Sequence, residues 1–173
     1  MFLSAGVIIA LAKPAIRILS TRQYHSAWQY IPLLAAATVF SSFSSFMGSV
    51  YVVTKRSEIS FVTSMAGTVI NISLNLLLIP SPLGVQGAAI ATFLSYFAVF
   101  IIRAVNSRKY IPFKLNGRHI AVNTALIMVQ TVFSVLELPF WIPIQAVCVA
   151  ALTAINLKFL LPFIIKIIRA VKK

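Results

Sequence analysis

The hydrophobic and polar positions divide this chain into six long apolar stretches separated by short turns. Each stretch has close to the ~20 residues that an α-helix needs to cross about 30 Å of hydrocarbon. Unbroken apolar runs favour helices, because the strands of membrane barrels are shorter and alternate in polarity. The pattern predicts an all-α, polytopic membrane helix bundle of about six transmembrane helices. The expected helices span residues 1–20, 30–53, 58–80, 83–104, 119–137 and 140–165.

The clearest boundary lies within residues 71–92, which read NISLNLLLIPSPLGVQGAAIAT. Pro80 ends one apolar helix, because proline lacks the backbone donor and restricts the residue before it. Asn71 and Asn75 are four residues apart and therefore share one face of that helix. Residues 87–89 begin the next helix with little side-chain bulk, which permits close packing in lipid. We expect a tight helical hairpin here.

Small and polar residues recur at helical spacing in the neighbouring stretches. The second stretch has a serine-rich face, which favours close helix packing over a ligand site. The third has a stripe that either packs on another helix or lines a hydrated cavity. Its members are Ser60, Ser64, Gly67, Asn71 and Asn75. Asn123 and Gln130 in the fifth stretch are expected to hydrogen-bond across helices, and Arg103 is expected at the inner membrane interface.

Composition strengthens the membrane assignment. Hydrophobic residues make up 60% of the 173 residues and charged residues 10%, whereas about a quarter of a soluble domain is charged. The net charge of +13 comes from fifteen Lys and Arg against two acids, Glu58 and Glu137. Most of these basic residues lie in loops between apolar segments, and they form no basic-aromatic surface on a soluble fold. We therefore expect no nucleic-acid partner. We infer instead that the positive charge sets the orientation of the chain in a membrane.

The basic residues alternate between the turns. Lys and Arg occupy the turns at 54–57 and 105–118 and the C-terminal tail, and are absent from those at 81–82 and 138–139. Only Arg22 departs from the alternation. Because basic loops remain in the cytoplasm, the basic loops and both ends of this segment are expected to be cytoplasmic.

The two ends of the chain lead to further expectations. Met1 opens directly into an apolar stretch without a basic region or a cleavage pattern, so we expect no signal peptide and interpret the chain as a piece of a longer protein.

At the other end, residues 158–173 form a basic amphipathic stripe. Such a stripe is typical of a helix lying on anionic membrane lipids.

Residues that carry chemistry are scarce. The chain has one cysteine, Cys148, and two widely separated histidines, and its two acids lie far apart in sequence. It has no glycine-rich phosphate loop and no spacing typical of metal ligands or of a nucleophile with its base. We expect neither an enzyme nor a metal or cofactor site, and the single cysteine excludes an intramolecular disulfide.

Lys13 and Arg17 lie one helical turn apart in the first stretch, on either side of Pro14. In one interpretation their long side chains reach the outer interface while Pro14 kinks the helix. In the other they face a water-filled cavity and hold an anion. Each such residue costs about 2.5–3.5 kcal/mol at the bilayer centre, so two on one face favour an adjacent polar surface.

Residues 71–92 carry a family resemblance. The matching motifs are Asn71-Ile72, Leu74-Asn75, Leu78-Ile79-Pro80, Gly84, Gly87-Ala88-Ala89 and Ala91-Thr92. They resemble the C-terminal signature of polysaccharide flippases, in the superfamily that also contains the MATE drug antiporters. Upstream, Lys13-Pro14, Tyr24, Ala27 and Pro32 are similar to the family's pattern before its next helix.

The resemblance implies a two-lobe, MATE-like flippase fold that works by alternating access. Residues 1–173 would be its C-terminal membrane domain, and a missing N-terminal lobe would be required. The implied function is translocation of an undecaprenyl-diphosphate-linked oligosaccharide across the bacterial cytoplasmic (inner) membrane, for O-antigen or other surface polysaccharide. Glycan polymerases and glycosyltransferases are further candidate partners.

Within this family, the residues favour a carrier of an anionic lipid. Lys13 and Arg17 would attract the diphosphate, and Asn71 and Asn75 would line or brace the cavity. A cation-coupled multidrug or metabolite antiporter usually needs a buried carboxylate, which no apolar stretch contains in its interior. A non-transporting membrane scaffold for a glycan-assembly complex is the third hypothesis.

The charge pattern makes a topological prediction. A reporter fused at Lys114 should be cytoplasmic and one fused at Pro82 should lie outside the cell, because only the former loop is basic. Activity of reporters that function on one side only is the measurement. The reverse result would refute the orientation.

Overall fold

The computed structural model describes the backbone of residues 1–110, 116–136 and 141–171, and within these ranges the side chains of all but residues 22, 23, 141 and 158–171. Every regular element in these ranges is a helix, which confirms the all-α prediction for this part of the chain. The α-helices are α1 (Phe2–Leu19), α2 (Ile31–Val53), α3 (Ser57–Leu78), α4 (Gly84–Asn106), α5 (Gly117–Val135) and α6 (Trp141–Val171). Two 3-10 helices, η1 (Arg22–Gln29) and η2 (Ser107–Lys109), connect them.

The six expected stretches coincide with these six α-helices to within two residues at every end but one. The exception is α6, which was expected to end at 165 and continues to Val171. Four helices, α1, α2, α3 and α4 extended by η2, are long and apolar enough to cross a membrane, whereas α6 adds a shorter apolar run over Ile142–Leu157 among the described residues. The chain is thus a helical protein with several membrane-length segments.

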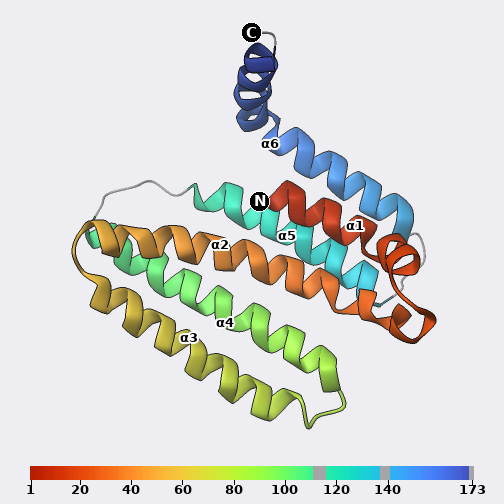
Figure 1. Ribbon diagram of the computed structural model, residues 1–173, viewed down its shortest axis with the longest axis horizontal. Coiled ribbons are helices and arrows are strands. Elements are labelled where there is room, and N and C mark those ends of the chain that lie inside the picture. Colours follow the sequence, from red (N-terminus) through yellow and green to blue (C-terminus); the bar gives the residue numbers. More distant parts are fainter. Residues whose placement is uncertain (111–115, 137–140, 172–173) are drawn as a thin grey trace.

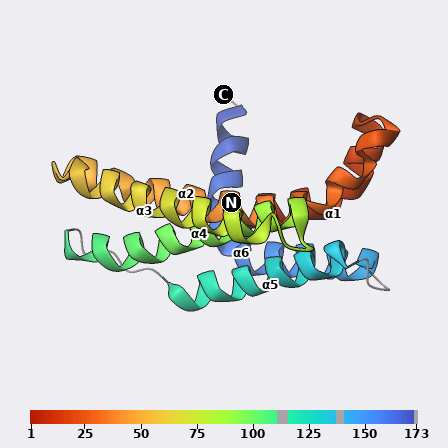
Figure 2. The ribbon, with the colours of Figure 1, turned by 90° about the horizontal axis from the view of Figure 1, so that it is seen from below.

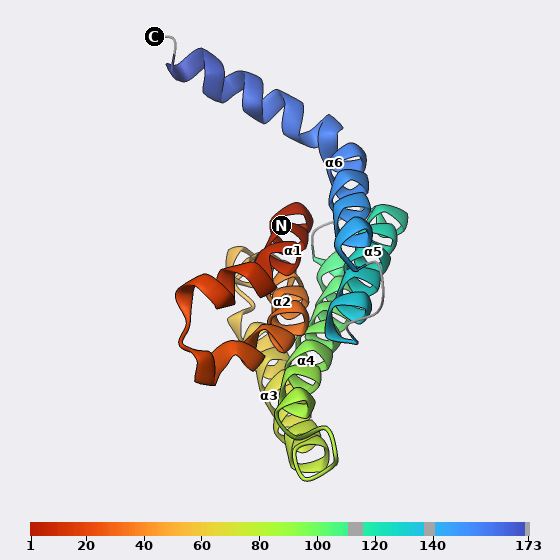
Figure 3. The same ribbon diagram turned by 90° about the vertical axis from the view of Figure 1, so that its right-hand side faces the viewer.

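The helices form two layers. Figure 2 and Figure 3 show α1, α2 and α3 in one layer and α4, α5 and α6 in the other. α2 packs along α4 and also contacts α1, α3 and α5, so it lies at the centre of the bundle (Figure 1). The C-terminal part of α6 turns away from the other helices (Figure 3).

Aromatic side chains fill the contact between α2 and α4. The ring of Phe40 lies 5.7 Å from that of Phe93, 5.0 Å from that of Phe97 and 5.3 Å from that of Phe100. The pairs with Phe93 and Phe97 meet edge to face, a favoured geometry for aromatic rings. Because lipid supplies no hydrophobic drive between helices, this direct packing accounts for the long α2–α4 contact.

The helical hairpin predicted from residues 71–92 is present as α3 and α4. α3 ends at Leu78, ahead of Pro80, and Gly84 begins α4 with a φ of +49°. A Cβ atom at Gly87 would lie 2.6 Å from the carbonyl oxygen of Leu78. The two backbones therefore approach more closely than any side chain would allow, as expected for small residues in membrane helices.

The expected hydrogen bonds of α5 are only partly present. Asn156 of α6 donates from Nδ2 to Asn123 Oδ1 at 2.9 Å, which confirms the prediction for Asn123. The prediction is wrong for the side chain of Gln130, whose amide atoms are buried without a hydrogen-bond partner among the described atoms. The bond instead uses the backbone carbonyl of Gln130, which accepts from Gln145 Nε2 at 2.9 Å.

The close approach in the hairpin predicts the effect of Gly87→Ala. The added methyl group would meet backbone atoms of α3, and such overpacking costs about 1–3 kcal/mol. Gly117→Ala is the matched control, because no atom lies within 4 Å of a Cβ there. Thermal unfolding in detergent should show a lower Tm for Gly87→Ala alone. An unchanged Tm would refute the close approach.

Candidate functional site

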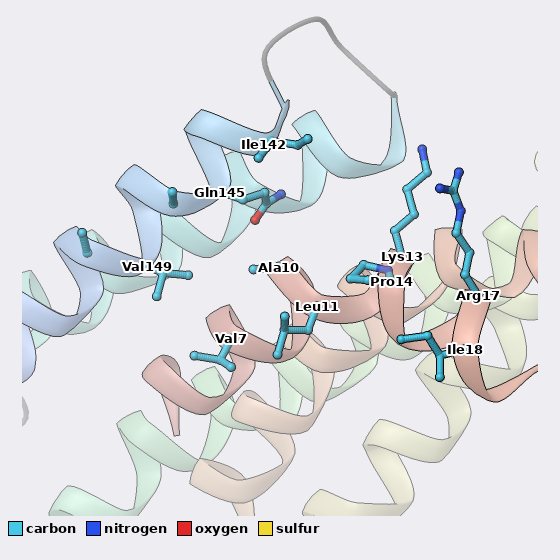
Figure 4. Close-up of a pocket in the computed structure, with 12 residues that line it drawn as sticks. Val7, Ala10, Leu11, Lys13, Pro14, Arg17, Ile18, Ile142, Gln145 and Val149 are labelled. Carbon is cyan, nitrogen blue, oxygen red and sulfur yellow. The ribbon is translucent and has the colours of Figure 1, made fainter.

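A cleft of about 900 Å³ lies between α1 and α6 (Figure 4). Most of its lining is apolar, and the polar exceptions are Lys13, Arg17 and Gln145. Figure 4 shows the side chains of Lys13 and Arg17 extending side by side, away from the apolar floor formed by residues such as Val7 and Leu11. The helical spacing of the two cations thus places them together at the edge of one apolar cleft.

Lys13 is held in place by η1. Its Nζ atom lies 4.5 Å from the ring centroid of Trp28, within the range of a cation–π interaction. Trp28 itself is buried, while Lys13 is half-buried and Arg17 is exposed. The two cations therefore differ: Lys13 is oriented by an aromatic ring, and Arg17 extends from the last turn of α1.

Gln145 supplies a polar group on the opposite wall of the cleft. Its Nε2 donates to the carbonyl of Gln130, while its Oε1 is buried without a hydrogen-bond partner among the described atoms. An unpaired buried oxygen costs free energy, so it is unusual in a packing surface. Gln145 was not among the residues predicted from the sequence; the signal for it is a lone amide in the apolar start of α6.

A second pocket, of about 590 Å³, lies between α2, α3 and α4. Most of its lining is polar. The lining residues are Ser41, Ser44, Ser45, Ser64, Gly67, Thr68, Asn71, Thr92, Ser95, Tyr96, Val99 and Arg103. The serine-rich face of α2 and the stripe of α3 therefore line a pocket in addition to packing. This pocket shares no lining residue with the cleft that holds Lys13 and Arg17.

The two asparagines predicted at the site have different positions. Asn71 lines the second pocket and donates from Nδ2 to Ser95 Oγ of α4 at 3.1 Å. Asn75 donates to the Asn71 side-chain oxygen at 3.0 Å and to its carbonyl at 2.9 Å. Asn75 therefore braces Asn71. The structure brings together Lys13 with Arg17 and Asn71 with Asn75, in two separate places.

Arg103 is the buried charge of the second pocket. The sequence predicted this residue at the inner membrane interface, and the structure places it in the last turn of α4, packed between helices and only 6% exposed. Nε donates to Thr63 Oγ1 at 2.9 Å, and Nη1 to the carbonyl of Ser44 at 2.7 Å. Nη2 donates to the carbonyl of Ser60 at 3.0 Å and to Ser64 Oγ at 2.8 Å. One guanidinium thus joins α4 to both α2 and α3.

Small residues make room for this guanidinium. A Cβ atom at Gly48 would lie 2.8 Å from Arg103 Nη1. The acceptors on these residues are the backbone carbonyls of Ser44 and Ser60 and the hydroxyl of Ser64. Because serine side chains are short, the guanidinium can reach all three. The planar guanidinium can satisfy several acceptors at once in a fixed geometry. Arg103 therefore explains the small residues at Ser44 and Gly48 of α2 and at Ser60 and Ser64 of α3.

Groups for covalent or metal chemistry are not gathered in the described part of the chain. No cluster of three or more His, Cys, Asp or Glu lies there that could hold a metal ion. Glu58 is exposed in the first turn of α3, and Glu137 lies outside the described residues. The two pockets offer cations, hydroxyls and amides, which suit the reversible binding of a polar or anionic ligand.

These features define the class of protein: a helical protein with several membrane-length helices and with pockets that contain cations, among them the two described above. No family model, curated protein or solved structure matches the chain. A more specific assignment therefore rests on the sequence motifs and on the pockets themselves.

The four hydrogen bonds of Arg103 predict a specific effect of Arg103→Lys. The ammonium group keeps the charge but cannot reach the same set of acceptors, and hydrogen bonds to a charged group contribute about 1.5–3 kcal/mol each. The free energy of unfolding in detergent should fall by at least that amount. The exposed Arg108 offers the control Arg108→Lys, which should change it by less than about 0.5 kcal/mol. Equal effects would contradict the buried position of Arg103.

Proposed function

We propose that this chain is the C-terminal membrane domain of a transporter that translocates an undecaprenyl-diphosphate-linked oligosaccharide across the bacterial cytoplasmic membrane. The observation that carries the proposal is the cleft between α1 and α6, which joins an apolar floor to two adjacent cations. The motifs over residues 71–92 support the same assignment independently.

The cleft is chemically complementary to a polyprenyl diphosphate. Its apolar residues would contact part of the prenyl chain, and Lys13 and Arg17 would bind the diphosphate at its edge. Arg17 is suited to this role because a guanidinium binds phosphate oxygens in a bidentate manner. The contact of Lys13 with Trp28 at 4.5 Å would hold the ammonium at the edge of the cleft and reduce the entropy lost on binding.

Side-chain length alone also explains why Lys13 and Arg17 lie near the end of α1, since both reach toward the membrane interface. That explanation requires no apolar cleft beneath them. The position of both cations at the edge of one apolar cleft favours a bound anionic headgroup over simple interfacial anchoring.

Transport in this proposal involves no covalent chemistry and no cofactor. The N-terminal lobe implied by the resemblance would complete the substrate path, and alternating access would expose it to each side of the membrane in turn. Glycan polymerases or glycosyltransferases are candidate partners on the two sides. A cation-coupled antiporter is less well supported, because of the chain's two acids Glu58 is exposed and Glu137 lies outside the described residues. A scaffold role would not use the cleft.

Export of the lipid-linked glycan by the complete protein tests the proposal. The double variant Lys13→Ala/Arg17→Ala should reduce export at least about tenfold at equal protein level, because the loss of 1.4 kcal/mol of binding is already a tenfold change. Arg17→Lys, which keeps a cation, should retain most of the export.

The matched control is Arg108→Ala/Lys109→Ala, which removes two exposed cations of η2 that do not line the α1–α6 cleft. Its export should equal that of the unmodified protein. Undiminished export by the Lys13/Arg17 double variant would refute the headgroup site. Normal export after deletion of the whole protein, with only partner recruitment lost, would indicate a scaffold instead.

A further inference from the structure

The guanidinium of Arg103 is buried without an acidic partner in the described part of the chain. All four of its hydrogen-bond acceptors, contributed by Ser44, Ser60, Thr63 and Ser64, are neutral oxygens. Removing a cation from water is costly, and neutral acceptors compensate for only part of that cost. A bound anion next to Arg103 would supply the missing opposite charge.

Two residues that line the second pocket have a donor without a hydrogen-bond partner among the described atoms. A guanidinium has five N–H donors, and the four bonds of Arg103 leave one on Nη1 without a partner among the described atoms. Ser44, which is 4% exposed, lines the same pocket, and its Oγ is buried without a hydrogen-bond partner there. A charged donor and an unused hydroxyl therefore lie in one pocket.

The remaining lining indicates what else the ligand carries. Hydroxyls of Ser41, Ser45 and Thr92 and the amide of Asn71 surround the same space. Such groups are both donors and acceptors, and they match a ligand with several hydroxyls of its own. The volume of about 590 Å³ lies within the roughly 300–1,000 Å³ of small-ligand pockets and exceeds the space that an inorganic ion would fill.

We propose that the pocket between α2, α3 and α4 binds an acidic sugar, with its carboxylate at Arg103 Nη1 and Ser44 Oγ and its hydroxyls at the serines and Asn71. This inference deepens the proposed function and rests on it for the identity of the sugar as a unit of the transported glycan. The α1–α6 cleft and this pocket would then bind two chemically different parts of one substrate.

Direct binding by the purified complete protein tests this assignment, with sodium glucuronate as the probe and glucose and sodium acetate as comparison ligands. Glucuronate should bind at least tenfold more tightly than either, as measured by calorimetry and by the rise in Tm. Binding of glucose as tight as that of glucuronate would overturn the role of Arg103. Equal binding of acetate would overturn the role of the hydroxyls.

Two serine variants on α2 locate the binding without disturbing Arg103. Ser45→Leu fills the pocket, whereas Ser49→Leu places the same side chain one turn away, at an exposed position outside the lining. Glucuronate affinity should fall at least tenfold in Ser45→Leu and stay unchanged in Ser49→Leu. An unchanged affinity in Ser45→Leu would overturn the proposed location.

The sugar site and the transport function can fail separately. A complete protein that exports its lipid-linked glycan but does not bind glucuronate would overturn the acidic-sugar site and leave the proposed function in place. A protein that binds glucuronate at this pocket but does not translocate the lipid-linked glycan would overturn the proposed function and keep the site.

Discussion

The hydrogen bonding of Arg103 is the interaction on which the arrangement of α2, α3 and α4 depends. A guanidinium that is 6% exposed must find acceptors inside the bundle, and the acceptors come from both neighbouring helices. Gly48 leaves the space that the guanidinium occupies. Arg103 therefore joins α4 to both α2 and α3, beside the polar pocket that these three helices line.

The α1–α6 cleft and the α2–α3–α4 pocket have different linings and suit different kinds of ligand. The α1–α6 cleft combines an apolar floor with Lys13 and Arg17 and suits an amphiphile with an anionic head. The α2–α3–α4 pocket is lined by hydroxyls and amides around Arg103 and suits a hydrophilic ligand. A lipid-linked oligosaccharide has both an anionic lipid end and a hydrophilic glycan. The two pockets thus match the two ends of such a substrate in chemistry.

Sequence periodicity predicted the features that are determined within one helix or between two helices that follow each other in the chain. It located the α-helices, the hairpin at Pro80 and the shared face of Lys13 and Arg17, because each follows from local backbone geometry and helical spacing. It did not predict environments that depend on distant helices. The burial of Arg103 could not be predicted from the sequence, because its acceptors lie about forty residues or more upstream. The pairing of Lys13 with Trp28 depends in the same way on how η1 folds back.

The most direct measurement of the central claim is translocation in proteoliposomes. The complete protein would be reconstituted at known density with a labelled undecaprenyl-diphosphate oligosaccharide in the inner leaflet. The appearance of the glycan on the outside would be followed with an impermeant glycan-cleaving enzyme. The account predicts protein-dependent translocation, with slower movement of a monophosphate analogue because it presents less negative charge to Lys13 and Arg17. Translocation no faster than in protein-free liposomes would contradict it.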